Sequence, residues 1–118
     1  MDVPAPREPL ALNGRAKPAA IQLRAGVPNR LRLINITATN VALVASLADR
    51  SELAEWKPLA KDGATLPPEQ SKPRRARQPI AVGETYDFEI ASAAPRNLWL
   101  EMRRGSGEWL LQAPVLIR

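Results

Sequence analysis

Cysteine and histidine are both missing from this chain of 118 residues. Without cysteine there is no disulfide, and the usual sequence clue to the redox compartment is lost. The two residue types also supply most transition-metal ligands, activated nucleophiles and general bases near neutral pH. The sequence therefore predicts no catalytic, cofactor-binding or metal-binding residues, and it argues against an enzyme acting on its own.

Long apolar runs are missing as well. No stretch approaches the ~20 apolar residues that a membrane-spanning helix needs, so no membrane span is expected. Residues 1–9 contain three prolines and lack the basic start and apolar stretch of a signal peptide. We expect residues 1–9 to be a flexible lead or an artificial end, and residues 10–118 to form one domain cut from a longer protein.

Helical periodicity is the third feature that the sequence lacks. Twelve prolines argue against long helices, and no segment keeps an apolar stripe at helical spacing. Short runs of alternating apolar and polar residues recur instead, bounded by Gly, Pro, Asn and Asp. About eight such strands, spaced by roughly 8–15 residues, predict an all-β Greek-key β-sandwich or barrel.

The segment 29–37 (NRLRLINIT) is the strongest of these strands. Leu33 shares one face with Asn35, whereas Ile34 and Ile36 lie on the other. The apolar face therefore changes near Leu33-Ile34, and a β-bulge is predicted there because one extra residue reverses the alternation. The amide of Asn35 lies between isoleucines, so we predict that it is buried and hydrogen-bonded.

Two later strands alternate clearly, and Tyr86, Phe88 and Ile90 are predicted to face inward. So are Leu98, Leu100 and Met102. A thioether is a weak metal ligand that normally accompanies cysteine or histidine, so Met102 is expected to pack in the core. Trp99 lies on the opposite face, either as a second packing layer or edge plug, or as a contact with another domain.

Four carboxylates in the second half of the chain could be imagined as an acid–base pair. Asp62 fits a turn and the other three alternate outward on a strand, so structural roles are expected for all four. They are Asp62, Glu84, Asp87 and Glu89. Asp87 is hypothesised to pair across the sheet with Arg30 or Arg32, which lie on the segment 29–37.

Residues 64–79 are rich in proline and arginine and are predicted to form a long surface loop. This loop carries a basic cluster, which consists of Lys72, Arg74, Arg75 and Arg77. The net charge of +5 suggests nucleic-acid binding, but the cluster holds no aromatic residue on which a base could stack. No nucleic acid is therefore expected, which leaves a solvated loop or a contact with an acidic partner or domain.

Four motifs follow one another in a fixed order: Asn13-Gly14, Gly26 with Arg30 to Asn35, Asp62-Gly63 with Pro67, and Gly83 to Asp87. Together they resemble the multicopper oxidase family and, more narrowly, its second, cupredoxin-like domain. The resemblance covers roughly residues 10–92. Two positions depart from the family pattern, since Asn29 replaces a tyrosine and residues 39–55 lack a histidine-containing strand.

The resemblance implies that copper sits only in neighbouring domains, which carry His-x-His and His-Cys-His segments. The chain would then be a non-catalytic structural domain of a multicopper oxidase-like protein, with adjacent cupredoxin domains as partners and no cofactor of its own. A periplasmic or secreted location is implied by the resemblance alone. The alternative is a stand-alone immunoglobulin-like or cupredoxin-like interaction module of a bacterial envelope protein, bound to a protein partner.

Overall fold

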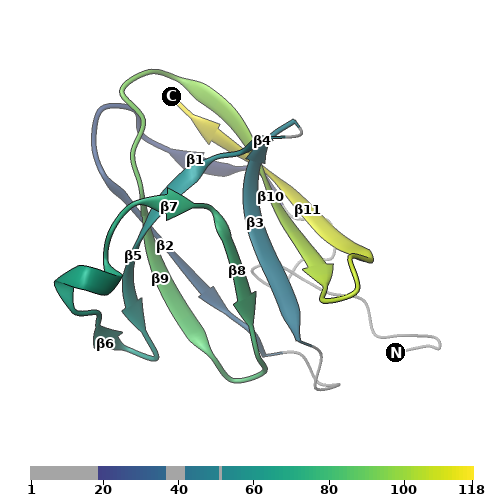
Figure 1. Cartoon of the computed structure of the whole chain (residues 1–118). Helices are drawn as coiled ribbons and strands as arrows, with labels where there is room; N and C mark the ends of the chain where they lie inside the picture. The colour runs from purple at the N-terminus through teal and green to yellow at the C-terminus, as the bar shows by residue number, and fades with distance from the viewer. Residues whose placement is uncertain (1–18, 37–41, 51) are drawn as a thin grey trace.

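The computed structural model describes residues 19–36, 42–50 and 52–118, and in this part of the chain two β-sheets pack face to face (Figure 1). One turn of 3-10 helix, η1 (Pro68–Gln70), accompanies the strands. No helix in the described ranges is long and apolar enough to cross a membrane. The strands are β1 (Ile21–Leu23), β2 (Asn29–Ile34), β3 (Leu43–Asp49), β4 (Glu52–Leu53), β5 (Glu55–Lys61), β6 (Ala64–Thr65), β7 (Arg74–Arg75), β8 (Arg77–Ile80), β9 (Thr85–Ile90), β10 (Arg96–Arg104) and β11 (Trp109–Ile117).

The larger sheet has six strands in the order β1-β11-β10-β3-β4, and β8 also pairs with β3. The smaller sheet has five strands in the order β2-β9-β5-β6, and β7 also pairs with β5. All of these pairs are antiparallel except β1 with β11. Consecutive strands often lie in different sheets, so the prediction of an all-β sandwich is confirmed.

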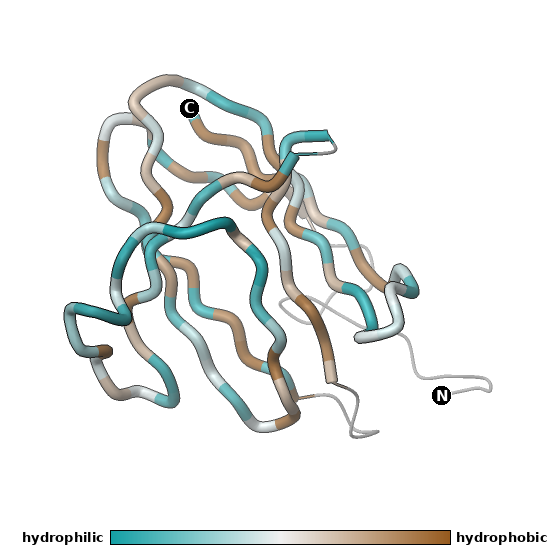
Figure 2. The backbone as a smooth tube through the Cα atoms, in the orientation of Figure 1, coloured by the Kyte–Doolittle hydropathy of each residue, from teal (hydrophilic) through white to brown (hydrophobic). Residues whose placement is uncertain are grey.

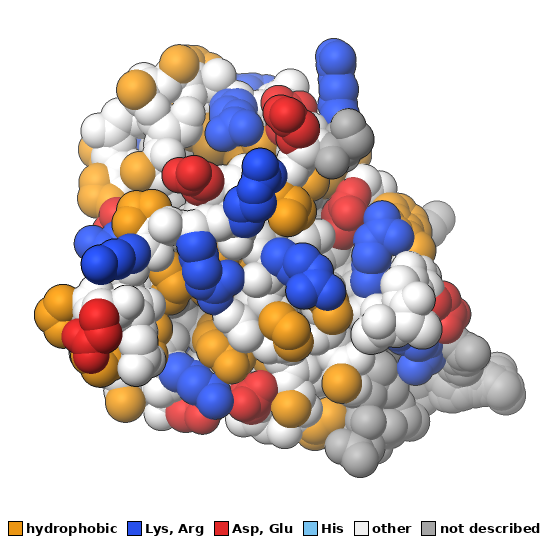
Figure 3. Space-filling model, viewed as in Figure 1, with side chains coloured by type: hydrophobic (Ala, Val, Ile, Leu, Met, Phe, Trp, Pro, Cys, Tyr) orange, Lys and Arg blue, Asp and Glu red, His pale blue; other side chains and the backbone are white. Residues whose placement is uncertain are grey.

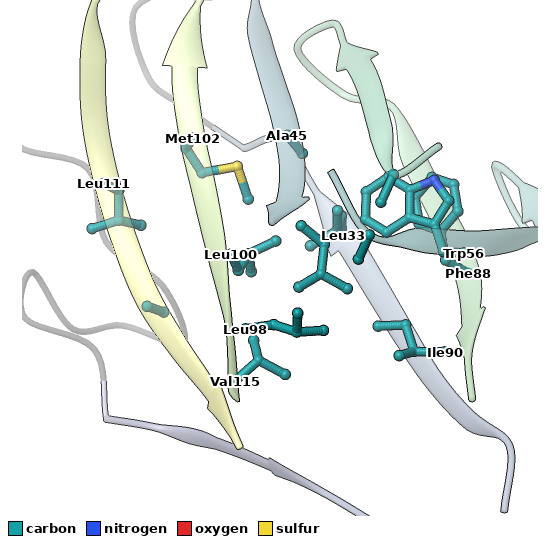
Figure 4. Packing of buried hydrophobic residues seen from close by; sticks show 14 of the residues in the cluster. Leu33, Ala45, Trp56, Phe88, Ile90, Leu98, Leu100, Met102, Leu111 and Val115 are labelled. Atoms are coloured by element: carbon teal, nitrogen blue, oxygen red, sulfur yellow. The ribbon is translucent and has the colours of Figure 1, made fainter. Parts of the chain in front are cut away.

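The core fills the space between the sheets, because alternate residues of each strand point inward. Figure 2 shows hydrophobic and hydrophilic residues alternating along several strands. Met102 and Leu100 of β10 reach toward the smaller sheet, where Trp56 stacks on Phe88 with 3.8 Å between ring centroids (Figure 4). The predicted inward positions on β9 and β10 that are buried are Phe88, Ile90, Leu98, Leu100 and Met102.

The segment 64–79, predicted to be a long surface loop, instead contributes strands to both sheets. Its backbone crosses from one sheet to the other at Ala76, whose side chain is buried. Ala76 N donates to Ala54 O at 2.9 Å, and Leu47 N donates to Ala76 O at 3.0 Å. A single small residue therefore joins the sheets at this corner, and the basic cluster lies on ordered backbone.

The β-bulge predicted near Leu33-Ile34 is wrong. Strands β2 and β9 pair in one unbroken register from Asn29 to Ile34. Ile34 and Ile36 therefore point outward, and Ile36 is 82% exposed. Asn35 explains the register, because its side chain is only 2% exposed and its Nδ2 donates to Ile80 O at 2.9 Å. A bulge would have turned this amide toward solvent and left the carbonyl without that bond.

The predicted Asp62-Gly63 turn is confirmed. It joins β5 to β6, with φ of 51° at Asp62 and 82° at Gly63. Positive φ at both central residues is typical of a type I′ hairpin turn, which favours Asp followed by Gly. The motif Asn13-Gly14 lies outside the described residues.

Candidate functional site

The outer face of the smaller sheet carries a buried carboxylate held by two arginines. Asp87 of β9 is 2% exposed, and both arginines come from the neighbouring strand β2. Arg30 Nε donates to Asp87 Oδ2 at 2.7 Å. Arg32 Nε and Nη2 donate to Asp87 Oδ1 and Oδ2, each at 3.0 Å. The predicted pairing is confirmed, with both candidate arginines engaged rather than one.

The ion pair shifts the pKa values of Asp87 and Arg32. Hydrogen bonds from Arg32, and then from Arg30, hold the pKa of Asp87 below its usual range, although burial of the carboxylate acts in the opposite direction. The same contact with Asp87 raises the pKa of Arg32. Asp87 therefore stays ionised near neutral pH with its oxygens occupied, which makes it a poor proton acceptor.

Glu84 and Asp62 support turns in the same sheet. Glu84 Oε1 accepts a hydrogen bond from Ala81 N at 2.8 Å, and Glu84 Oε2 lies 3.1 Å from Lys61 Nζ. The Ala81 N–H, and then Lys61, lower the pKa of Glu84. Asp62 Oδ1 accepts from Thr85 N at 2.9 Å. These bonds explain the two carboxylates as structural groups.

The residues do not fit the copper that the resemblance implies for its family. Copper centres are built from imidazole and thiolate, and the whole chain has neither. Within the described ranges, no group of three or more carboxylates is placed to hold a metal ion. Met102 is buried and points into the core among hydrophobic side chains (Figure 4).

The outer face of the larger sheet is apolar around Trp99, which is 40% exposed. Trp99 of β10 lies opposite Ala48 of β3 and opposite Pro114 of β11, and Ala48 lies opposite Leu53 of β4. Residues that lie directly opposite in neighbouring strands share one face of a sheet. We call this surface, made of Ala48, Leu53, Trp99 and Pro114, the Trp99 face.

The edge-plug interpretation of Trp99 is wrong, because β10 pairs on both sides, with β3 and with β11. Trp99 instead lies over the interior of the sheet. Apolar side chains in this position suit contact with a second surface, as aromatic residues are enriched where interfaces are fully buried.

The basic ridge is the third feature, and we define it as the predicted cluster of Lys72, Arg74, Arg75 and Arg77. All four residues are exposed; the three arginines lie on β7 and β8 at the corner of the sandwich, and Lys72 lies on the bend that precedes β7. Figure 3 shows several Lys and Arg side chains over these two strands on the face that Figure 1 presents.

Comparison with known proteins identifies the fold of the chain. No protein-family model and no curated protein sequence matches the chain. Several solved structures match it, among them three multicopper oxidases. The multicopper oxidase from Pediococcus acidilactici aligns with a TM-score of 0.60 at 6% identity, over 86% of this chain and 21% of that one. Another multicopper oxidase gives 0.61 and 11%, over 83% and 32%. The bacterial laccase-like multicopper oxidase CueO from Ochrobactrum sp. gives 0.63 and 20%, over 85% and 21%.

These matches show that the sandwich is cupredoxin-like and resembles part of a multicopper oxidase. The chain spans about a fifth to a third of the length of the three proteins. Each of them therefore has further protein beside the region that this chain resembles.

Proposed function

We propose that this chain is a copper-free structural domain of a multicopper oxidase-like protein, and that it holds neighbouring copper-binding domains in position. The observation that carries the proposal is the match of most of the chain to a minor part of three multicopper oxidases. The complete lack of histidine and cysteine supports it, because copper sites in proteins are built mainly from these two residue types.

The Trp99 face supplies a place for such a neighbour. An exposed tryptophan with apolar residues on the strands beside it loses hydration favourably when a second domain covers it. The stable core between the two sheets needs nothing from this face, since the core residues of β10 point the other way. We propose that the neighbouring domain packs here, and that the whole protein resides in the periplasm or outside the cell.

The reading frame on either side of this segment gives the first test. We expect it to encode His-x-His and His-Cys-His segments, the copper-binding elements that this chain lacks. A frame that begins and ends with this domain, or flanking domains without those segments, would favour a stand-alone interaction module of the same fold.

Copper titration of the purified chain gives the second test. We expect no stoichiometric Cu(II) binding in calorimetry and no intense visible absorption, for the wild type and for Met102→Leu alike. The leucine keeps the volume of the buried side chain, so the variant should remain folded and isolates the thioether. Tight binding by the wild type that Met102→Leu abolishes would overturn the copper-free role.

A further inference from the structure

The basic ridge is fixed to the body of the protein. Ala76 lies at its centre with no exposed surface, and its N–H and carbonyl bond to Ala54 and Leu47. Since successive side chains of an extended backbone point to opposite sides, Arg75 and Arg77 project outward on either side of this buried residue. The two guanidinium groups therefore stand on backbone that is anchored to both sheets.

Arg74 is held in place by its own neighbours. Its Nη1 donates to Arg77 O at 2.8 Å, and its Nη2 donates to the side-chain oxygen of Gln78. The guanidinium carbon also lies 5.8 Å from the centroid of the Phe88 ring. Such contacts reduce the side-chain freedom that would be lost on binding a partner.

The charges of the ridge lack carboxylate partners. In the described part of the chain, no Asp or Glu forms an ion pair with any of its four residues. Glu55 lies opposite Arg75 in the pairing of β5 with β7, yet no ion pair joins the two side chains. Several other basic residues do have carboxylate partners, namely Arg30, Arg32, Lys61, Arg103 and Arg104.

We infer that the basic ridge is a docking surface for an acidic surface of a protein partner. Guanidinium groups without carboxylate partners bind carboxylates in two-pronged geometry, and their attraction speeds the encounter. Nucleic acid suits the ridge less, because single strands need exposed aromatic platforms. None of the five aromatic residues belongs to the ridge, and the two that lie beside Arg74, Trp56 and Phe88, are buried. The ridge would serve this purpose whether or not the chain is part of an oxidase.

The test uses a fluorescent short polyglutamate peptide as a probe and measures its anisotropy on titration with the full chain. We expect the wild type to bind the peptide and to lose affinity as salt rises, because exposed charges are screened. The double variant Arg75→Gln/Arg77→Gln should bind the peptide roughly fivefold more weakly, since it loses two solvent-exposed ion pairs with the peptide carboxylates.

The matched control is Arg24→Gln/Arg96→Gln, which removes the same charge from two exposed residues outside the ridge. Its affinity should stay within about twofold of the wild type. Thermal unfolding verifies that both double variants are folded. The inference is overturned if the wild type does not bind the peptide, or if the two variants weaken binding equally. It is also overturned if a single-stranded oligonucleotide or vesicles of phosphatidylserine bind the ridge more tightly than polyglutamate.

Discussion

Replacing Asp87 with alanine removes the carboxylate that joins Arg30 to Arg32 across β2 and β9. The variant leaves two arginines side by side on one strand without their shared counter-charge. It also deletes three hydrogen bonds from the two arginines to one buried carboxylate. We expect the variant to fold and to be less stable than the wild type.

The magnitude depends on how exposed the arginines are. A hydrogen bond to a charged group contributes about 1.5–3 kcal/mol when its partners are buried. Here the side chains of Arg30 and Arg32 are 57% and 59% exposed, so water replaces much of what they lose when Asp87 is removed. We therefore expect a total loss of about 2 kcal/mol, which lowers the Tm by roughly 6–10 °C in a domain of this size.

Thermal and denaturant unfolding, followed by circular dichroism, measure this loss. Glu89→Ala is the matched control, because it removes the same charge from the same strand two residues away and Glu89 forms no ion pair within the described residues. The control should change the free energy of unfolding by less than about 0.5 kcal/mol. Equal losses for Asp87→Ala and Glu89→Ala would refute the reasoning, since the pairing would then contribute nothing beyond net charge.

The pH dependence of the stability difference between wild type and Asp87→Ala follows from the lowered pKa of Asp87. A carboxyl group whose pKa is lower in the folded state stabilises the fold fully above its unfolded pKa, near the ordinary value of 3.8. This contribution is lost as the pH falls through the folded pKa, which lies below that value. The stability difference between wild type and Asp87→Ala should therefore be constant near neutral pH and shrink as the pH falls below about 4.

Three further substitutions test other parts of the structure. Asn35→Ala should destabilise the chain by about 1–3 kcal/mol in urea unfolding, because it leaves the buried carbonyl of Ile80 without its partner. Gly63→Ala should lower the stability by about 1 kcal/mol, since φ is 82° there, whereas Gly105→Ala, which has no positive φ, should not. Trp99→Glu should lower the Tm of the isolated chain by only a few degrees, because Trp99 is already 40% exposed. If a neighbouring domain packs on the Trp99 face as we propose, the same substitution should abolish co-elution of the chain with that domain in size-exclusion chromatography.

The strands of the second half could be predicted from sequence because their alternation is local. Phe88 and Ile90 lie on the core face as predicted, and so do Leu98 and Leu100. In such strands every second residue faces the core, so the inward-facing residues can be identified from the sequence alone. Asp87 also occupies its predicted outward position. It is nevertheless buried, because the side chains of Arg30 and Arg32 pack against it, and the alternation of residues does not predict such burial.

The errors arose where distant residues decide the local structure. On β2 the apolar pattern favoured a bulge, but Asn35 is fixed by a carbonyl 45 positions away on β8. In the segment 64–79, prolines and arginines suggested a loop, but β7 and β8 find partners in β5 and β3. Such strand pairing depends on which sheet edges the rest of the chain leaves unpaired, and the local sequence pattern does not predict this.

The outer faces of the two sheets differ in the free energy of covering them with another protein surface. Covering the smaller sheet would remove the exposed parts of Arg30 and Arg32 from water, and a charge that loses hydration must regain it from precise new partners. Covering the larger sheet would bury Trp99 and its apolar neighbours, which is favourable for almost any complementary apolar surface. A neighbouring domain held permanently in place is therefore expected on the larger sheet. The outer face of the smaller sheet and the basic ridge, which lies at the corner between the two sheets, remain toward water, where their charges act best on partners that bind transiently.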